Sequence, residues 1–542
     1  MKLQSILLTV LIIGFINSNL QAQQGNTGRN NKLDSIFFKD IPKDAPGAAV
    51  AILMDGNVIY ERYGGLSDLK KNQTIDENTR FNIASNGKQF TALAVLLLEE
   101  AEKLSLDDDI RKYLPTLFKE IKDSILVRHL LTHTSGIRDV YDLWSLKGLT
   151  WWEEKFSNKD AFDLLAMQTE LNFKPGTEYL YSNSNYILLT EIVSATSGMD
   201  FVSFTDAMFK QLGMSNTSFV DNYKQIKSPI AKPYFNFDKW FNYNWTCNIH
   251  GDGNLFSPMK DQITWEKLLI DANSEYLSEE TIRKLQILVP NFKNYGFGLE
   301  FGTYKGKEYR FHEGSTGAWK ATTIRFNQPQ LTIVTLSNSG KITTDRQTRN
   351  MADVLLFSGE ANERIQLEPD TVGAFLDLPQ IVGAYVSGNS VFQFEARNNE
   401  LFLLRYGRND TKLVRESDNV FHQWNDPAFK QEFIVNNDKS VTVTFYHTSH
   451  QPYSSIKEYS DWSSFDFTSI KGKYRNDETD IEFFLNPLIN NKYELKIGKQ
   501  KAEGILITPK KLFVDGYTLD LSSDDVFLNG NRIRQVRFEK IE

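Results

Sequence analysis

A serine and a lysine three positions apart, Ser85 and Lys88, stand immediately before a long apolar stretch. Residues at positions i and i+3 of a helix lie on one face, so the lysine amine can reach the serine hydroxyl. An adjacent base activates a serine as a nucleophile without a histidine and an aspartate. The pair therefore predicts acyl-transfer chemistry, with Ser85 as nucleophile and Lys88 as a candidate base.

The stretch that follows distinguishes this pair from others with the same spacing. Residues 90–98 are apolar on nearly every side of a helix, which predicts a buried helix. A serine at the first turn of such a helix lies beside the positive end of the helix dipole. The other pairs lie in turns or loops or are followed by a proline: Ser67/Lys70, Ser257/Lys260 and Ser454/Lys457.

Tyr181 and Asn183 form a second candidate set, because a turn signal at residues 174–177 would hold both on a fixed loop. A tyrosine phenol acts as acid or base when adjacent cations lower its pKa. The asparagine amide can contact both Lys88 and a substrate. The same spacing recurs in the C-terminal region, so this motif is informative only together with the serine and the lysine.

His312, Glu313 and Gly314 lie in a stretch with a strand pattern. Side chains alternate along a strand, so His312 and Gly314 share one face while Glu313 points to the other. A glycine lets a substrate approach the backbone closely, and the amide of Ser315 can pair with that of Ser85 as an oxyanion hole. A lone histidine is more often structural than catalytic. The order of the three motifs favours a catalytic role for His312.

The composition limits the classes of partner. The chain has 542 residues, 41% of them hydrophobic, which is enough for a large core and two to four domains. A net charge of -8 without a basic stripe argues against a nucleic-acid partner. The single cysteine, Cys247, excludes intrachain disulfides and cysteine-based metal sites, and is expected to be buried. We predict no cofactor and no metal, and a small-molecule or peptide substrate as the partner.

Residues 1–22 have the pattern of a secretory signal peptide. Lys2 supplies a positive charge, residues 6–16 form an apolar run, and polar residues surround Ala22. The run is short for a membrane span, so no integral span is predicted beyond the signal. Leu20 stands where a cleavage site usually has a small residue, and an uncleaved anchor is the alternative. We expect a soluble protein that is exported to the periplasm or secreted.

Strand and helix patterns define a first domain at residues 32–359. Two short strand patterns flank Asp55-Gly56, a strong hairpin turn signal. Helical patterns dominate from residue 85 to about residue 210. Because strands occur at both ends of the region, we expect one sheet assembled from both ends. The later strands are expected at residues 296–300, 310–312, 320–326 and 331–337.

Beyond residue 366 the pattern changes to short alternating strands. The stretch Ile381–Tyr385 resembles Ile470–Tyr474, and an alternating hairpin pattern follows each of them. This internal repeat predicts two related antiparallel β-barrel-like modules, at residues 366–462 and 465–542.

The motifs taken together resemble those of the β-lactamase-related serine hydrolases, which include class C β-lactamases, DD-peptidases, esterases and D-aminopeptidases. Stretches at residues 128–136 and 253–257 match as well, and the resemblance covers residues 45–345. It implies an α+β fold in which an antiparallel sheet packs against helices. Ser85 would lie in the cleft between the sheet and an all-helical region, and His133 would be structural.

One position departs from the family pattern. True β-lactamases and DD-peptidases resemble each other in having a lysine at the third motif, where it helps to bind a substrate carboxylate; this chain has His312 there. A largely neutral imidazole binds a carboxylate less well than an ammonium does. This disfavours β-lactam hydrolysis and favours ester or D-amino-acid amide hydrolysis. D-aminopeptidases of the family are similar in carrying two β-barrel domains after the catalytic one.

The sequence therefore predicts an exported serine hydrolase that cleaves an amide or ester bond through a Ser85 acyl-enzyme. Whether Lys88 or Tyr181 is the general base stays open, as do the substrate, the oligomeric state and the role of the β modules. A β-lactamase or DD-carboxypeptidase is one alternative. A penicillin-binding sensor that acylates without turnover is an alternative of another class.

Overall fold

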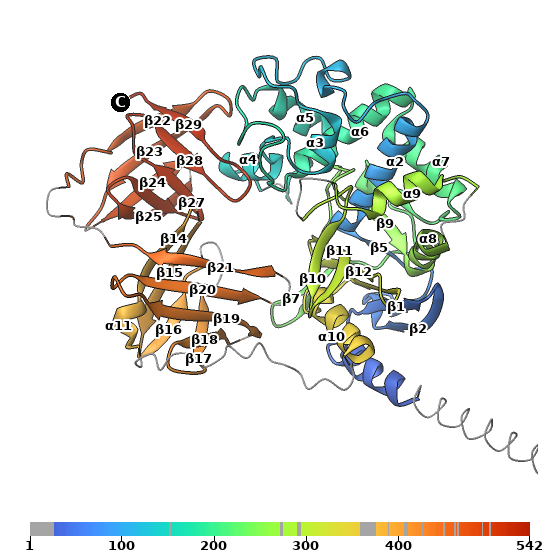
Figure 1. Cartoon of the computed structure of the whole chain (residues 1–542). Coiled ribbons are helices and arrows are strands. Elements are labelled where there is room, and N and C mark those ends of the chain that lie inside the picture. The colour runs from blue at the N-terminus through green and yellow to red at the C-terminus, as the bar shows by residue number, and fades with distance from the viewer. Residues whose placement is uncertain are drawn as a thin grey trace, which may run out of the picture.

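The structure of the chain is a computed structural model (Figure 1). The predicted signal peptide lies outside the described residues. The structure describes residues 27–150, 153–271, 275–289, 294–357, 376–388, 390–405, 410–424, 426–447, 450–459, 462, 465–489, 491–497 and 500–542.

The sheet of the first domain joins strands from both ends of that domain, as predicted. Its six antiparallel strands run in the order β10-β11-β12-β13-β1-β2. The first hairpin of the chain therefore pairs with the last strand of the domain, and one sheet closes the region. The strands are β1 (Ala48–Met54), β2 (Asn57–Gly64), β10 (Glu300–Tyr304), β11 (Lys307–Thr316), β12 (Trp319–Phe326) and β13 (Leu331–Ser337).

The turn between β1 and β2 has the conformation that its sequence predicts. Asp55 has φ +48° and Gly56 has φ +77°. Two successive residues with positive φ match the right-handed twist of the flanking strands, and Asp-Gly is a favoured pair for this turn.

One predicted strand is wrong. Residues 296–300 were expected to be extended, but β10 begins only at Glu300. Gly298 has φ +78°, and a Cβ atom there would lie 2.5 Å from the backbone nitrogen of Gln89. The stretch is therefore a turn pressed against the start of α2, and an alternating apolar pattern cannot reveal that approach.

Helices cover both faces of the sheet and form a helical region beside it (Figure 1). A helix over residues 27–38 and α10 pack on one face, where Leu33, Phe37 and Met351 join Val50 and Ile333 in one apolar cluster. The helices are α2 (Lys88–Glu100), α3 (Val127–Leu131), α4 (Val140–Leu146), α5 (Asn158–Ala166), α6 (Asn183–Ser197), α7 (Phe201–Gln211), α8 (Met259–Asp271), α9 (Glu279–Gln286) and α10 (Thr344–Leu356).

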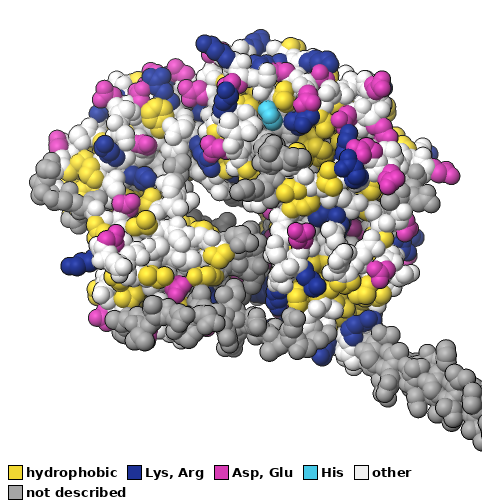
Figure 2. All heavy atoms as spheres, viewed as in Figure 1, with side chains coloured by type: hydrophobic (Ala, Val, Ile, Leu, Met, Phe, Trp, Pro, Cys, Tyr) yellow, Lys and Arg dark blue, Asp and Glu magenta, His cyan; other side chains and the backbone are white. Residues whose placement is uncertain are grey.

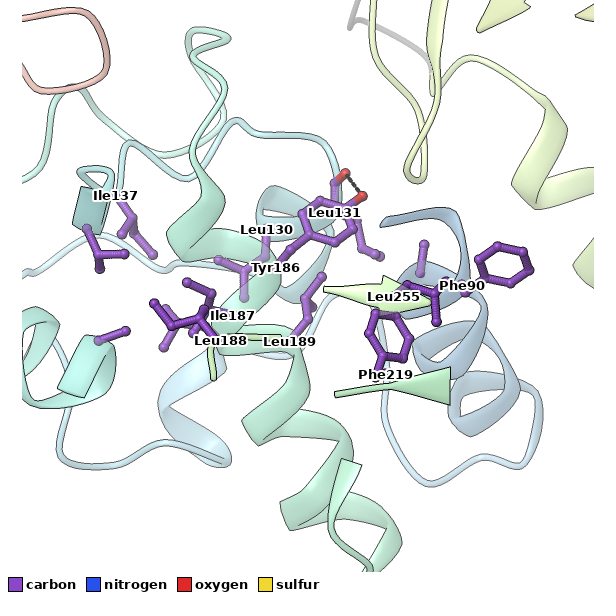
Figure 3. Packing of buried hydrophobic residues seen from close by; sticks show 14 of the residues in the cluster. Phe90, Leu130, Leu131, Ile137, Tyr186, Ile187, Leu188, Leu189, Phe219 and Leu255 are labelled. Atoms are coloured by element: carbon purple, nitrogen blue, oxygen red, sulfur yellow. Dashed lines mark hydrogen bonds between the residues drawn. The ribbon is translucent and has the colours of Figure 1, made fainter. Parts of the chain in front are cut away.

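The main core lies where α2 and α6 pack together with α3. Figure 3 shows Phe90 with Phe219 and Leu255 at one end of this cluster, and Leu131 beside Tyr186. The Tyr186 hydroxyl donates a hydrogen bond to the Leu131 carbonyl at 2.9 Å, which satisfies the phenol inside the core. Helix α2 begins at Lys88 and helix α6 begins at Asn183. The packing of these two helices therefore fixes the two candidate site residues relative to each other.

Short elements complete the first domain. They are β3 (Leu66–Asp68) with β4 (Gln73–Thr74), β5 (Arg80–Asn82) with β9 (Leu255–Pro258) and β6 (Ser218–Phe219), β7 (Tyr234–Asn236) with β8 (Trp240–Asn242), and the 3-10 turns η1 (Ala84–Gly87), η2 (Ile110–Lys112) and η3 (Tyr223–Gln225). No single described helix is long and apolar enough to cross a membrane. Helices α6 and α7 meet that test only as a pair, and they are bent by 83° relative to each other.

Two closed antiparallel barrels of eight strands each follow the first domain, which confirms the predicted fold class. The first barrel follows α11 (Leu378–Ile381). Its strands are β14 (Gly383–Ser387), β15 (Ser390–Arg397), β16 (Glu400–Leu403), β17 (Thr411–Arg415), β18 (Val420–Gln423), β19 (Asp426–Val435), β20 (Val441–His447) and β21 (His450–Lys457). The strands of the second barrel are β22 (Gly472–Asn476), β23 (Ile481–Pro487), β24 (Lys492–Ile497), β25 (Gln500–Thr508), β26 (Lys511–Val514), β27 (Tyr517–Asp520), β28 (Val526–Asn529) and β29 (Val536–Lys540).

The second barrel docks on the helical region next to α4 (Figure 1). Arg138, a fully buried side chain, forms an ion pair with Glu478 of this barrel, and Lys147 donates to the Thr479 carbonyl at 2.8 Å. On the face shown in Figure 2, acidic and basic side chains are interspersed over the described parts of both regions. The docking contact includes the buried ion pair of Arg138 with Glu478.

Candidate active site

Ser85 lies on a tight 3-10 turn directly before α2 rather than inside the long helix. The preceding residue, Ala84, has φ +48°, which is uncommon for a residue with a side chain. The side-chain oxygen of Asn82 accepts a hydrogen bond from the Ala84 amide at 2.9 Å, and Asn82 in turn donates to Asn254 at 3.0 Å. Buried polar contacts therefore hold the turn that presents Ser85, and local strain of this kind is typical of functional sites.

Lys88 lies beneath Ser85, and its side chain is fully buried. Its amine donates to Ser85 Oγ at 3.1 Å, to Asn183 Oδ1 at 2.9 Å and to the Asp252 carbonyl at 2.5 Å. Burial lowers the pKa of Lys88 to about 7, against an attraction to Asp252 that raises it. A large fraction of Lys88 is therefore neutral near pH 7, as a general base requires.

Asn183 is oriented by Asp139. The Asp139 carboxylate accepts hydrogen bonds from the backbone amide of Asn183 at 2.6 Å and from its side-chain amide at 3.0 Å. The Asn183 side-chain oxygen is therefore the atom that faces Lys88. Asp139 also accepts from the amide of Tyr141 at the start of α4, so one buried carboxylate connects the two helix ends.

Tyr181 lies over the Lys88 amine, which is 4.9 Å from the centre of its ring. Burial raises the pKa of Tyr181 well above its usual value, although a hydrogen bond with Ser85 and the charge of Arg532 oppose this shift. The phenol therefore carries its proton at neutral pH. The ring of His133 lies against Tyr181 at a centroid distance of 4.2 Å, which gives this buried histidine a packing contact with the site.

His312 lines the site, but both of its ring nitrogens are engaged. Nδ1 lies 2.8 Å from the Glu313 carbonyl, so it carries the proton, and Nε2 accepts from the Tyr295 hydroxyl at 3.0 Å. Burial lowers the pKa of His312 to about 3. The catalytic role predicted for His312 does not fit this geometry as a proton transfer with Tyr181, because the acceptor nitrogen of His312 is used by Tyr295. A positioning role fits instead.

Gly314 and Ser315 follow on β11, and Glu313 points to the opposite face, where it pairs with Arg349 of α10 at 3.3 Å. A Cβ atom at Gly314 would lie 2.2 Å from the Ile83 carbonyl oxygen. The glycine thus allows β11 to approach the Ser85 turn, rather than admitting substrate as predicted. Ser315 is exposed at the pocket, where its hydroxyl accepts a hydrogen bond from Lys320.

Five of the predicted site residues line a pocket of about 680 Å³: Ser85, Tyr181, Asn183, His312 and Ser315. Tyr141 and Asp142 of α4 and Trp245 line it as well. Cys247 also lines it, and burial raises the pKa of this thiol to about 12, so the cysteine is unreactive at neutral pH. No group of three or more His, Cys, Asp or Glu side chains within the described ranges is arranged to hold a metal ion.

Several pocket residues were missed by sequence reasoning. Asp252 and Glu300 line the pocket, and burial raises the pKa of Glu300 to about 7. Arg532 also lines it, although it belongs to the second barrel. Asp252 lies beside the matched stretch at residues 253–257, which is the one signal that could have found it.

The comparisons with known proteins agree with this fold. The β-lactamase family model matches residues 36–356, more than half of the chain, and the chain therefore belongs to the β-lactamase family of serine hydrolases.

Particular relatives cover much of the chain. Penicillin-binding protein 4* of Bacillus subtilis (strain 168) is 26% identical over 417 residues, 72% of this chain and 90% of that protein. A D-aminopeptidase of Brucella anthropi is 28% identical over 360 residues, 63% of this chain and 66% of that enzyme, just under two thirds of its length. The structure of an octameric penicillin-binding protein homologue from Pyrococcus abyssi has a TM-score of 0.57 at 22% identity. That similarity covers 79% of this chain and 99% of the other, and it shows a shared fold.

Proposed function

We propose that this protein cleaves an amide or ester bond through an acyl-enzyme on Ser85, with a D-amino-acid amide, a peptide or a carboxylic ester as substrate. The observation that carries the proposal is the buried Lys88 amine, 3.1 Å from Ser85 Oγ and with a pKa of about 7. Tyr181 keeps its proton because burial raises its pKa. We therefore assign the general base to Lys88 and the proton donor to Tyr181.

In the proposed acylation step, Lys88 takes the Ser85 proton while Oγ bonds to the substrate carbonyl carbon. The amides of Ser85 and Ser315 stabilise the resulting oxyanion. The bond to the leaving nitrogen or oxygen then breaks, and that atom takes the proton of Tyr181. The Lys88 ammonium returns a proton to Tyr181, so both groups regain their starting forms.

In the proposed deacylation step, water is the nucleophile and Lys88 is again the base. A water molecule gives a proton to Lys88 as it attacks the acyl carbon, and the bond to Ser85 Oγ breaks. Ser85 recovers its proton from Lys88, and the carboxylic acid product leaves. The residues around the pair have supporting tasks: Asn183 and the Asp252 carbonyl hold the amine in place, and the neutral His312 fixes Tyr295.

The substrate class is supported by the third motif and by a relative. His312 is neutral, so β11 offers no cation of the kind that binds a β-lactam carboxylate at this position. The similarity to a D-aminopeptidase supports an amide of a D-amino acid. We also propose that the protein is exported, on the N-terminal pattern of residues 1–22. N-terminal sequencing of the protein from fractionated cells would test this.

The test is steady-state hydrolysis of a p-nitrophenyl short-chain ester, a D-alanine anilide and a chromogenic cephalosporin. We expect turnover of the ester or the anilide, lowered at least about 10³-fold in Ser85→Ala and about 10²- to 10³-fold in Tyr181→Phe. Ser454→Ala is a matched control, because Ser454 precedes Lys457 by the same spacing but lies in the first barrel. This control should retain full activity.

Two other outcomes would replace the proposal. Faster turnover of the cephalosporin than of the ester and the anilide would make the protein a β-lactamase. Turnover of none of the three, with a stable mass increase from a β-lactam probe that Ser85→Ala abolishes, would indicate a penicillin-binding protein without turnover.

A further inference from the structure

The second barrel inserts a loop into the pocket. Residues 530–535 connect β28 to β29, and Asn531 and Arg532 line the pocket beside Tyr181. The backbone of this loop is held at two residues. Asp142 accepts from the Arg532 amide at 2.7 Å, and Asn172 donates to the Arg532 carbonyl at 3.1 Å while accepting from the Arg534 amide at 2.6 Å.

The side chain of Arg532 has hydrogen-bond donors available to a ligand in the pocket. Its guanidinium carbon lies 5.0 Å from the centre of the Tyr181 ring, and one of its nitrogens lies 3.7 Å from the Asp139 carboxylate. The side chain is 33% exposed. A guanidinium has five N–H donors, and none of the residues that the structure describes accepts a hydrogen bond from this one.

Arg532 is also the one lysine or arginine among the described residues that line the pocket. The Asp139 carboxylate is committed to Asn183 and to the start of α4, so it does not occupy the guanidinium donors. Buried or half-buried charges are normally paired or hydrogen-bonded. The planar guanidinium of Arg532 has N–H groups without a hydrogen-bond acceptor among the described residues, and a guanidinium can bind a carboxylate through two parallel hydrogen bonds.

We propose that Arg532 binds a carboxylate on the leaving group of the substrate, and so supplies from the barrel the cation that β11 lacks. The inference rests on the proposed hydrolase function. It places the carboxylate on the leaving group because Tyr181, the proposed proton donor to that group, lies directly under the guanidinium. The preferred substrate class is then an acyl-D-amino-acid derivative, such as a peptide that ends in a free carboxylate.

Matched thioesters test the proposal. N-acetyl-D-alanyl thioglycolate and its methyl ester have the same scissile bond and differ only in the leaving-group carboxylate. We expect wild type to favour the free acid in kcat/KM by roughly 10- to 100-fold, the range for hydrogen bonds to a charged group. Arg532→Gln should bring the ratio close to one, and Arg532→Lys should retain part of it. Arg534→Gln, on the same loop but paired with Glu178, should leave the ratio unchanged.

Opposite results would overturn the inference. An equal fall in kcat/KM for both thioesters in Arg532→Gln would mean that Arg532 only positions Tyr181. Thermal unfolding of each variant verifies that the fold is intact, which is expected because the Arg532 backbone, not its side chain, anchors the loop.

A binding measurement separates this inference from the hydrolase proposal. Ser85→Ala protein is titrated with N-acetyl-D-alanyl-D-alanine and with its C-terminal amide. Tighter binding of the acid that disappears in Ser85→Ala/Arg532→Gln supports the carboxylate site, even if wild type hydrolyses nothing. Equal binding of acid and amide would reject the site, even if wild type is an active hydrolase.

Discussion

The two C-terminal barrels have the same architecture but different relations to the catalytic domain. Each closes eight antiparallel strands in chain order. The repeat predicted from sequence is visible in a shared contact: Tyr385 donates its hydroxyl proton to the Ile381 carbonyl, and Tyr474 donates to the Ile470 carbonyl, both at 2.9 Å. Each tyrosine thus bonds to the residue four positions before it at the entry to its barrel.

Their cores differ. The first barrel encloses an apolar cluster of its own, around Phe394, Phe433 and Phe445. The buried side chains of the second barrel, such as Phe483 and Phe538, belong to the same continuous cluster as the helical region. The second barrel is therefore expected to unfold together with the catalytic domain, and the first barrel separately.

The connection between the last two strands differs as well. In the first barrel two residues separate β20 from β21, whose ends pair at His447 and His450. In the second barrel the connection is longer, residues 530–535, and its Asn531 and Arg532 line the pocket. This longer connection places Arg532 of the second barrel in the pocket beside Tyr181.

The largest expected difference between the barrels concerns their charged contacts. Glu478→Ala removes the partner of the buried Arg138 and the acceptor for Thr169, whose amide and hydroxyl both donate at 2.7 Å. Removing one partner of a buried ion pair costs about 3–5 kcal/mol, and among the described residues Arg138 keeps only the half-exposed Glu170, at 3.6 Å, as an ion-pair partner. The first domain and the second barrel are expected to unfold as one unit, and we expect the free energy of unfolding of that unit to fall by this amount. Urea denaturation measures it.

The matched change in the first barrel is Glu416→Ala. Its partner Lys430 lies 2.7 Å away, and the Glu416 side chain is partly exposed. Both residues belong to the first barrel, whose apolar core is separate, so the free energy of unfolding of the first domain should be unaffected. Similar losses in both variants would show that the second barrel does not stabilise the catalytic domain in the way its contacts indicate.

A smaller effect is expected from the repeated tyrosines. Tyr385→Phe and Tyr474→Phe each remove one hydrogen bond and leave a carbonyl unsatisfied, at a cost of about 1 kcal/mol. Calorimetry should show two transitions. Tyr474→Phe should lower the transition at which hydrolysis is lost, and Tyr385→Phe should lower only the other one. A shift of both transitions by either variant would contradict the two separate cores.

The sequence predicted what depends on local pattern. The spacing of Ser85 and Lys88, the Asp55-Gly56 turn and the alternating strands of the barrels each follow from neighbouring residues, and the structure contains all three. Gly298 misled the prediction because an apolar run contains a turn that only the approach of α2 explains.

Arg532 could not be found in this way. Arg532 reaches the pocket because the second barrel docks on the helical region through Arg138 and Glu478. The sequence around residue 532 has no pattern that predicts this contact. The engagement of His312 with Tyr295 was hidden for the same reason, because the two residues meet only in the folded pocket.

The smallest predicted effect is electrostatic and concerns Arg532 again. Burial lowers the pKa of Lys88, and the positive charge of Arg532 lowers it further. Replacing Arg532 by glutamine removes this repulsion, so the pKa of Lys88 should rise. The base must be unprotonated, so the rising limb of kcat/KM near pH 7 should move to higher pH.

The measurement uses the methyl ester thioester, since a neutral substrate separates the pKa effect from carboxylate binding. At a pH below this limb, Arg532→Gln should be slower than wild type, and the two should converge above it. Arg397→Gln, in the first barrel and paired with Glu395 and Asp410, should leave the limb in place. A limb that does not move in Arg532→Gln would mean that the second barrel affects the substrate without changing the base. The loop at residues 530–535 would then bind substrate without affecting the pKa of Lys88.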